Sequence, residues 1–246
     1  MANSPSSTST QSPGTCPFSE AYLLKLKKEN RLYTDIEVKE FPNTFFYNLH
    51  QLEWEYQAFV TRKLVKYFND RMADGRILEI ECESGWLSHL IASTGQCEVL
   101  GLDRTPELIA QGQRNFKHPR LQLIQGDLMG RLPKLGQFDA IVLNGSLSFF
   151  PDVGDVILKC QEFLEPGGEI HILHTPFYSQ REAAPIRAKT EAHYQEINCE
   201  SMIPHHFHHL KESLAPFECH YLYKPFFATG MLNRKASPYP WIRIST

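Results

Sequence analysis

Apolar residues follow two different patterns along the chain, and the change between them lies near residue 72. Between residues 52 and 68, Leu, Tyr, Phe and Val recur at intervals of three and four, the spacing of an amphipathic helix of about five turns. From residue 76 onward, short apolar runs alternate with helical patterns. Such alternation predicts parallel strands joined by right-handed helical crossovers. We therefore expect an α/β domain preceded by a helical segment.

The alternating part of the chain yields a specific set of elements. Strands are predicted near 76–80, 97–102, 120–125, 138–143 and 168–174, with two further candidates at 217–223 and 241–244. Helices are predicted near 86–94, 105–116 and 152–164, and a polar, helix-prone stretch covers 180–196. Thr105 is suited to cap the second of these helices, because Pro106 follows at its first position.

Composition divides the chain into three parts. Residues 1–17 are rich in Ser, Thr and Pro with almost no large apolar group, so we expect a disordered tail. Residues 18–71 form a predicted helical cap, and 72–246 form the α/β domain. The apolar stripe of the 52–68 helix is predicted to pack on the sheet. It could also cover a ligand cleft, together with the aromatic cluster Phe45–Tyr47.

The most informative stretch runs from Ile77 to Trp86, where a buried strand is followed by a tight turn and a helix start. Such a junction presents free backbone N–H groups to a ligand. It resembles the first motif of class I S-adenosylmethionine-dependent methyltransferases, which reads apolar-apolar-acid-apolar-Gly-x-Gly-x-Gly. Glu79 matches the acid and Gly85 the third glycine, whereas Glu81 and Glu83 stand in place of the first two glycines.

Further positions match the same family in the same order. Asp103 ends the second strand, where the family binds ribose hydroxyls, and Asp127 with Leu128 follows the third, where it binds adenine. Asn144 follows the fourth strand, along the cofactor, and Leu164-x-Pro-Gly-Gly leads into the fifth. The resemblance covers about residues 72–175. It implies a doubly wound, seven-stranded, mostly parallel sheet with a final antiparallel pair, and S-adenosylmethionine as cofactor.

Glu81 and Glu83 are counted among the cofactor-binding residues with Glu79, but as altered ones. We expect at least one of the two carboxylates to point away from the ligand, because two carboxylates in a dry site repel each other. Such a turn requires the glutamates to avoid positive φ. The sequence then predicts a pocket that binds the cofactor more weakly than one built on Gly-x-Gly.

Two residues are candidates for the catalytic step. His174 lies at the carboxyl end of the fifth strand, and Tyr178 follows it closely; either could take a proton from an acceptor, or simply line the cleft. The cluster from His205 to His209 invites a metal interpretation, but no HExxH pattern accompanies it, and we predict no metal. P-loop, α/β-hydrolase and NAD-type Rossmann motifs are absent from the sequence.

Charge and composition limit the partners. The net charge is −3 without a basic stripe, so no nucleic-acid partner is expected. Apolar runs fall short of the roughly 20 residues that cross a bilayer, and six scattered cysteines without a CxxC pair suit a cytoplasmic protein. Two functions remain: a methyltransferase acting on a small-molecule acceptor, or an inactive methyltransferase-like binding or scaffold protein. The oligomeric state stays open.

Overall fold

The computed structural model describes residues 16–225 and 236–245. Their centre is a seven-stranded sheet in the order β3-β2-β1-β4-β5-β9-β8. The strands are β1 (Arg76–Ile80), β2 (Glu98–Asp103), β3 (Leu121–Gln125), β4 (Phe138–Asn144), β5 (Leu164–Leu173), β8 (Cys219–Tyr223) and β9 (Trp241–Ser245). β9 pairs antiparallel with both β5 and β8, and the other pairs are parallel. The predicted doubly wound, mostly parallel sheet is confirmed.

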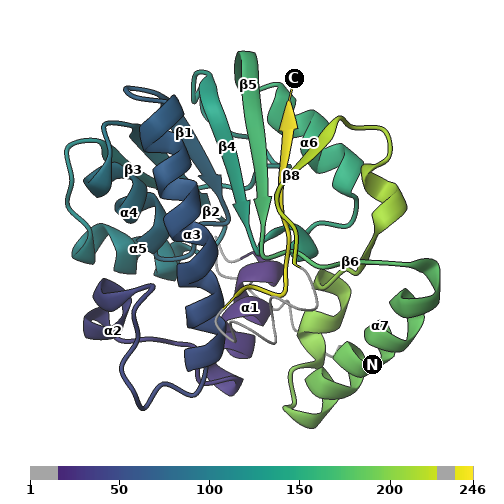
Figure 1. Cartoon of the computed structure of the whole chain (residues 1–246). Helices are drawn as coiled ribbons and strands as arrows, with labels where there is room; N and C mark the ends of the chain where they lie inside the picture. Colours follow the sequence, from purple (N-terminus) through teal and green to yellow (C-terminus); the bar gives the residue numbers. More distant parts are fainter. Residues whose placement is uncertain (1–15, 226–235, 246) are drawn as a thin grey trace, which may run out of the picture.

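Helices cover both faces of the sheet (Figure 1). They are α1 (Pro17–Lys28), α2 (Asp35–Glu40), α3 (Gln51–Arg71), α4 (Trp86–Thr94), α5 (Pro106–Asn115), α6 (Val153–Gln161) and α7 (Gln180–Glu196). Alternate residues of a strand point to opposite faces. Ile77 of β1 accordingly joins the core under α3 and α4, and Leu78 joins the core under α6. The central strands are therefore buried on both sides, as their continuous apolar runs predict.

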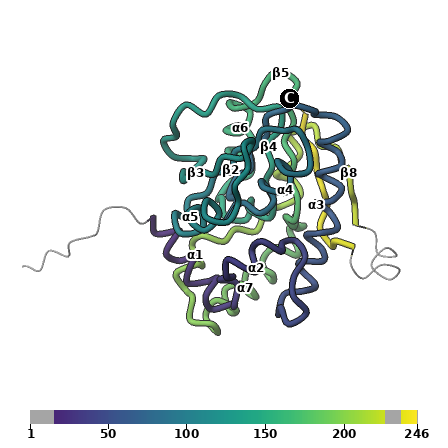
Figure 2. Tube along the Cα trace, turned by 90° about the vertical axis from the view of Figure 1, so that its left-hand side faces the viewer, coloured from purple at the N-terminus to yellow at the C-terminus, as the bar shows by residue number. Residues whose placement is uncertain are grey.

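The N-terminal helices gather at one end of the sheet. Figures 1 and 2 show α1, α2 and α7 beyond the carboxyl ends of the parallel strands. Phe18, Tyr22 and Leu26 of α1 share an apolar cluster with Leu108 of α5 and Tyr194 of α7. α1 is thus wedged between the α/β domain and a late helix, across the edge where open α/β sheets bind ligands.

Three segments singled out in the sequence are the predicted N-terminal tail, the Pro-Gly-Gly segment and the His-rich segment. Residues 1–15 of the tail lie outside the described residues, and α1 already begins at Pro17. The Pro-Gly-Gly segment lies inside β5, where the register with β4 shifts between the Phe138–Leu164 and Ala140–Glu169 pairs. The His-rich segment contains the short strand β7 (His209–Leu210), which pairs with β6 (Phe177–Tyr178) in a separate two-stranded sheet.

Close packing of α5 against the turn after β1 fixes the position of that turn. A Cβ atom on Gly112 would lie 2.1 Å from the backbone oxygen of Ser84 and 2.7 Å from Leu123 Cδ1. Backbone cannot move aside as a flexible side chain can, so only glycine fits this position. Gly112 of α5 therefore supports the turn that carries Glu81 and Glu83.

This contact predicts that replacing Gly112 by alanine lowers stability, although alanine normally stabilises a helix relative to glycine. Gly112→Ala should destabilise the protein by about 1–3 kcal/mol through overpacking, although alanine is the better helix former by about 1 kcal/mol. Ala110→Gly on the exposed side of α5 is the control and should cost only the propensity difference. Urea denaturation measures both variants, and a Gly112→Ala protein more stable than the parent would contradict the contact.

Candidate active site

All three glycine positions of the motif adopt left-handed backbone, including the two occupied by glutamate. φ is 54° at Glu81, 53° at Glu83 and 75° at Gly85. The expectation that the glutamates avoid positive φ is wrong. For a residue with a Cβ this conformation costs roughly 1–2 kcal/mol, so other contacts must hold it. Three are visible: Cys82 N donates to Leu102 O (3.1 Å), Gly85 N to Cys82 O (2.8 Å), and the third involves Glu83.

That third contact comes from Asp103, the last residue of β2. One carboxylate oxygen of Asp103 accepts from Glu83 N at 2.8 Å, and the other accepts from Thr105 N at 2.7 Å. Asp103 is 1% exposed, and this burial raises the pKa of its carboxyl to about 6. The carboxylate thus joins the turn after β1 to the start of α5. It lies at the pocket wall, and ribose binding by Asp103 stays a prediction.

Glu81 is held by a buried ion pair. Its Oε1 lies 2.9 Å from Arg104 Nε, with side chains 4% and 11% exposed. The Arg104 guanidinium also stacks over Phe18 of α1, 3.6 Å from the ring centroid, and lies 5.1 Å from that of Phe150. Burial and the nearby Asp103 raise the pKa of Glu81, and Arg104 opposes that rise. The substituted first glycine is therefore connected to the cap helix α1.

Glu83, at the second substituted position, is bound by the cap directly. Its carboxylate accepts a hydrogen bond from the Tyr22 hydroxyl of α1. Among the described residues Glu83 has no ion-pair partner. Burial and the negative charge of Glu83 raise the pKa of Tyr22 well above its usual value. Tyr22 therefore stays protonated, and its hydroxyl is the donor of this hydrogen bond.

Glu79, the acid of the motif, is buried under the turn. It is 3% exposed, and Ser88 Oγ of α4 donates to its Oε2 at 2.5 Å. Burial is the main reason why the pKa of Glu79 rises to about 8, and the charges of Glu83 and Asp103 add to the rise. A positive charge near this carboxyl would favour its ionised form.

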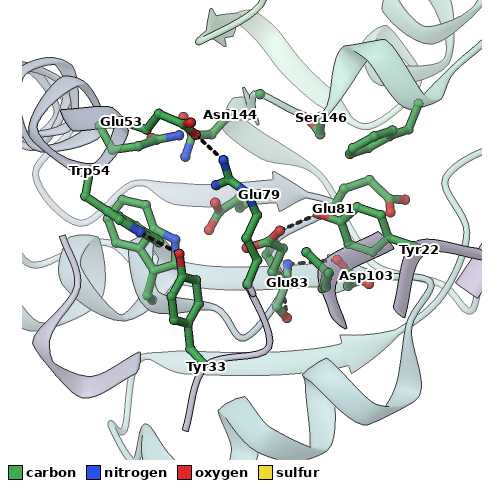
Figure 3. A pocket seen from close by; sticks show the side chains of 17 residues that line it. Tyr22, Tyr33, Glu53, Trp54, Glu79, Glu81, Glu83, Asp103, Asn144 and Ser146 are labelled. Atoms are coloured by element: carbon green, nitrogen blue, oxygen red, sulfur yellow. Dashed lines mark hydrogen bonds and ion pairs between the residues drawn. The ribbon is translucent and has the colours of Figure 1, made fainter. Parts of the chain in front are cut away.

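These side chains face one cavity of about 160 Å³ at the carboxyl ends of β1, β2 and β4. Figure 3 shows them together with cap residues from α1 and α3. The lining comprises Tyr22, Leu26, Arg31, Tyr33, Glu53, Trp54, Gln57, Glu79, Glu81, Cys82, Glu83, Trp86, Asp103, Asn144, Gly145, Ser146 and Phe149. Both glutamates of the turn belong to it, so the expectation that one points away is wrong. The turn's φ values and hydrogen bonds direct both side chains into the wall.

At and just after the end of β4, two atoms of the wall have no hydrogen-bond partner among the described residues. They are Asn144 Oδ1 and Ser146 Oγ. Ser146 is only 2% exposed. Buried polar atoms without a partner are uncommon in native structures. In a cavity wall they are available to a polar ligand, which agrees with the predicted position of Asn144 beside a cofactor.

The other expected cofactor residues lie outside this cavity. Gly85 is the N-cap of α4, and a Cβ there would lie 2.5 Å from Leu123 Cδ2. Asp127 Oδ1 accepts from Met129 N at 3.0 Å, and Leu128 is fully buried in the core. Gly85 and Leu128 thus have packing roles visible in the structure, and adenine binding by Asp127 stays a prediction.

The two expected catalytic residues also stand apart from the cavity lining. His174 is 8% exposed, has φ of 50°, and has an Nε2 atom without a partner among the described residues. Burial lowers the pKa of its imidazole to about 3, so the ring is neutral and only weakly basic at physiological pH. Tyr178 is half-buried in β6, with its pKa raised by burial. Their catalytic roles stay predictions.

The cap supplies wall residues that sequence reasoning did not assign. Arg31 forms ion pairs with Glu53 and, at 3.3 Å, with Glu29. Tyr33 Oη accepts from Trp54 Nε1 at 3.1 Å. The apolar stripe did indicate that α3 could reach the cleft. The polar residues on the other positions of α3, Glu53 and Gln57, carried no signal because exposed helix faces are polar anyway.

The side chains of the His-rich segment pack against one another and against α7. His206 stacks on His208 with ring centroids 5.0 Å apart, and Tyr194 Oη lies 2.6 Å from His206 Nδ1. Within residues 16–225 and 236–245, no three His, Cys, Asp or Glu side chains form a group able to hold a metal ion. None of the described helices is long and apolar enough to cross a bilayer.

The comparisons with known proteins agree with this geometry. Residues 77–168 match a family model described as a methyltransferase domain. That segment contains the whole run from β1 to the Pro-Gly-Gly turn, on a sheet that is mostly parallel, as expected. Within this segment the chain resembles the class I methyltransferases. Solved methyltransferase structures share its fold: one from Mesorhizobium loti superposes with a TM-score of 0.57 at 16% identity, covering 79% of this chain and 98% of the other.

Other relatives differ in what they methylate. The chain is 29% identical over 139 residues to a 2-phytyl-1,4-naphtoquinone methyltransferase of Synechococcus elongatus, and the match covers 53% of this chain and 56% of the relative. It is 26% identical over 208 residues to a 23S rRNA (uracil(1939)-C(5))-methyltransferase of Shewanella woodyi, with 81% of this chain and 44% of the relative covered. The chain thus spans about half the length of the curated relatives it matches.

The raised pKa of Glu79 predicts a pH-dependent stability. The fold binds the proton more tightly than the unfolded chain does, so the free energy of unfolding should fall as pH rises from about 4.5 to about 8. Glu79→Gln keeps an acceptor for Ser88 but cannot ionise. It should be more stable than the parent at pH 8 by about 2–4 kcal/mol, and less pH-dependent.

Denaturation from pH 5.5 to 8.5 tests this, with Glu98→Gln as control at the exposed start of the neighbouring strand. The remaining dependence belongs to Asp103 and Glu81, whose raised pKa values act in the same direction. Identical pH profiles for the parent and Glu79→Gln would contradict the assignment.

Proposed function

We propose that this protein transfers a methyl group from S-adenosylmethionine to a small-molecule acceptor. The observation that carries the proposal is the cavity itself. The motif turn, Asp103 and Asn144 come from three different strand ends, and they meet in one wall. In open α/β sheets this edge is where ligands bind.

The polar groups of the wall fit that cofactor. Asp103 offers a carboxylate to ribose hydroxyls, and Glu79 and Glu83 offer carboxyls to the ammonium of the methionyl part. Arg31 is a cation in the same wall that would hold its carboxylate. Asn144 and Ser146 supply unpartnered polar atoms. When bound, the cofactor supplies an electrophilic methyl group on a sulfonium, so the chain's own task is to orient the reactants and exclude water.

A small acceptor fits the enclosure of the site better than a macromolecule. The cavity is partly covered by side chains of α1 and α3, and it lies within a protein whose net charge is −3. A nucleic acid needs a basic, open surface. The naphtoquinone relative and a magnesium protoporphyrin IX methyltransferase from Synechocystis, which shares the fold with a TM-score of 0.57 at 11% identity, have small acceptors in their names.

Removal of the acceptor's proton is the least defined part of the reaction. His174 and Tyr178 remain the proposed groups, because both follow β5 near the same end of the sheet. With a pKa of about 3, His174 would act as a neutral hydrogen-bond acceptor for an O–H or N–H. An acceptor that is already nucleophilic needs no stronger base.

The cap must move for ligands to enter. At about 160 Å³ the cavity is smaller than the roughly 300–1,000 Å³ of sites for small molecules and cofactors. Residues 18–71 form the proposed cap over the domain 72–246. α1 is tied to that domain by the Tyr22–Glu83 bond and by Ser19 Oγ, which donates to Arg104 O at 3.0 Å. Opening these contacts enlarges the cavity.

Isothermal titration with S-adenosylmethionine and S-adenosylhomocysteine tests the proposal, with ATP as a control ligand. We expect binding of both adenosyl compounds and none of ATP. A panel of small phenols, amines and carboxylates, scored by formation of S-adenosylhomocysteine, then tests transfer. If neither S-adenosylmethionine nor S-adenosylhomocysteine binds, the result would favour the alternative, an inactive binding or scaffold protein.

Asp103→Ala should weaken S-adenosylmethionine binding by about 1.5–3 kcal/mol, because the ribose hydroxyls lose a charged acceptor. The same change frees the N–H of Glu83, so circular dichroism must show that the fold persists. Asp127→Asn is the milder comparison, since an amide oxygen still accepts a hydrogen bond. Equal affinities for the parent and Asp103→Ala would refute the placement.

Tyr22→Phe should loosen the cap without changing the pocket's charge. We expect the association and dissociation rates of S-adenosylmethionine to rise together, each by roughly three- to tenfold for a hydrogen bond of about 1 kcal/mol. Stopped-flow fluorescence measures both rates. Tyr67→Phe is the matched control, because Tyr67 Oη donates to Glu169 at 2.8 Å away from the cavity. Unchanged rates in Tyr22→Phe would exclude the gating role.

A further inference from the structure

The cavity wall carries more negative than positive groups. Its carboxyls are Glu53, Glu79, Glu81, Glu83 and Asp103. Arg31 pairs with Glu53, and Arg104 pairs with Glu81. Among the described residues this leaves Glu79, Glu83 and Asp103 without a cationic partner. One of these three, Glu83, stands where the motif has glycine, so the excess is in part a property of this chain.

The wall also holds a polar atom that points to a ligand independently of the acids. Ser146 is 2% exposed, and its Oγ has no hydrogen-bond partner among the described residues. Ser146 lies in the same wall as Asn144 (Figure 3). Asn144 ends β4, the strand between β1 and β5, and Ser146 follows it by two residues. The acids are therefore part of a binding wall rather than a solvated acidic surface.

We propose that Glu83, with Glu79 and Asp103, makes this pocket select the positively charged methyl donor over its neutral demethylated product. The inference rests on the proposed function. S-adenosylmethionine carries a sulfonium, an ammonium and a carboxylate, with a net charge of +1. When the methyl group leaves, the sulfur keeps the bonding electron pair and becomes a neutral thioether. S-adenosylhomocysteine therefore has a net charge of zero.

The positions of the three carboxyls give this charge difference its effect. All three line one small cavity, in which Glu79 is 3% and Asp103 1% exposed. The effective dielectric constant there is below that of water, and salt screens less than at an exposed surface. Both ligands bring an ammonium to these carboxyls, and only S-adenosylmethionine adds the second positive charge of its sulfonium. Shape and hydrogen bonds to ribose and adenine are the same for both ligands. The charge term therefore favours release of the product and limits product inhibition.

The experiment compares three ligands by isothermal titration at pH 8 on the full chain. They are S-adenosylmethionine, S-adenosylhomocysteine and sinefungin, in which a carbon bearing an ammonium stands where the sulfonium lies. We expect the parent to bind both cationic ligands at least about tenfold more tightly than the neutral one, the size of one charge interaction in such a site. Glu83→Gln keeps an acceptor for Tyr22 and should reduce this ratio about threefold or more.

Controls separate this inference from the function on which it rests. Glu98→Gln, at the other end of β2, should keep the parent's ratio, and Glu79→Gln offers a second variant if Glu83→Gln does not fold. Binding of all three ligands by the parent with equal affinity overturns the inference and leaves the proposed function intact. Binding of none overturns the proposed function. A ratio unchanged in both folded variants assigns selectivity elsewhere and refutes the role of these carboxyls.

Discussion

The carboxylate of Asp103 is the constraint on which the site depends. It accepts one backbone N–H from the turn after β1 and another from the start of α5, so a single buried side chain fixes two loops. These bonds hold Glu83 in left-handed backbone, and Gly112 supports the same turn from behind. The left-handed backbone that glycine usually permits is held here by contacts from Asp103 and Gly112. A motif can therefore lose two glycines and keep the path of its backbone.

The cap is chemically coupled to the altered turn. Each substituted position has acquired a contact with α1: Glu81 through Arg104, which stacks on Phe18, and Glu83 through Tyr22. A glycine at either position could make neither contact. Closure of the cap and the charge of the pocket thus depend on the same two side chains, so movement of α1 also changes the surroundings of the carboxyls that face the ligand.

Sequence reasoning recovered the sheet because its signals are local. The run from Ile77 to Ile80 and the acid at Asp103 each follow from neighbouring residues. The seven-stranded sheet with its final antiparallel pair was implied by the resemblance to class I methyltransferases. The orientation of Glu81 and Glu83 was wrongly predicted because it depends on hydrogen bonds to Asp103 and Tyr22, residues distant along the chain. Arg31 and Glu53 were missed for the same reason: only the folded cap brings them to the wall.

Clustered carboxyls carry a cost in stability that a structural role alone does not explain. Burial raises the pKa of Glu79 to about 8 and that of Asp103 to about 6, so near neutral pH the fold works against their ionisation. Apolar residues of similar size would remove that penalty. A cationic ligand converts the same repulsion into binding energy, because it stabilises the ionised forms. Glu83 fits this exchange, because it adds a carboxyl without a cationic partner among the described residues, at a position held in left-handed backbone.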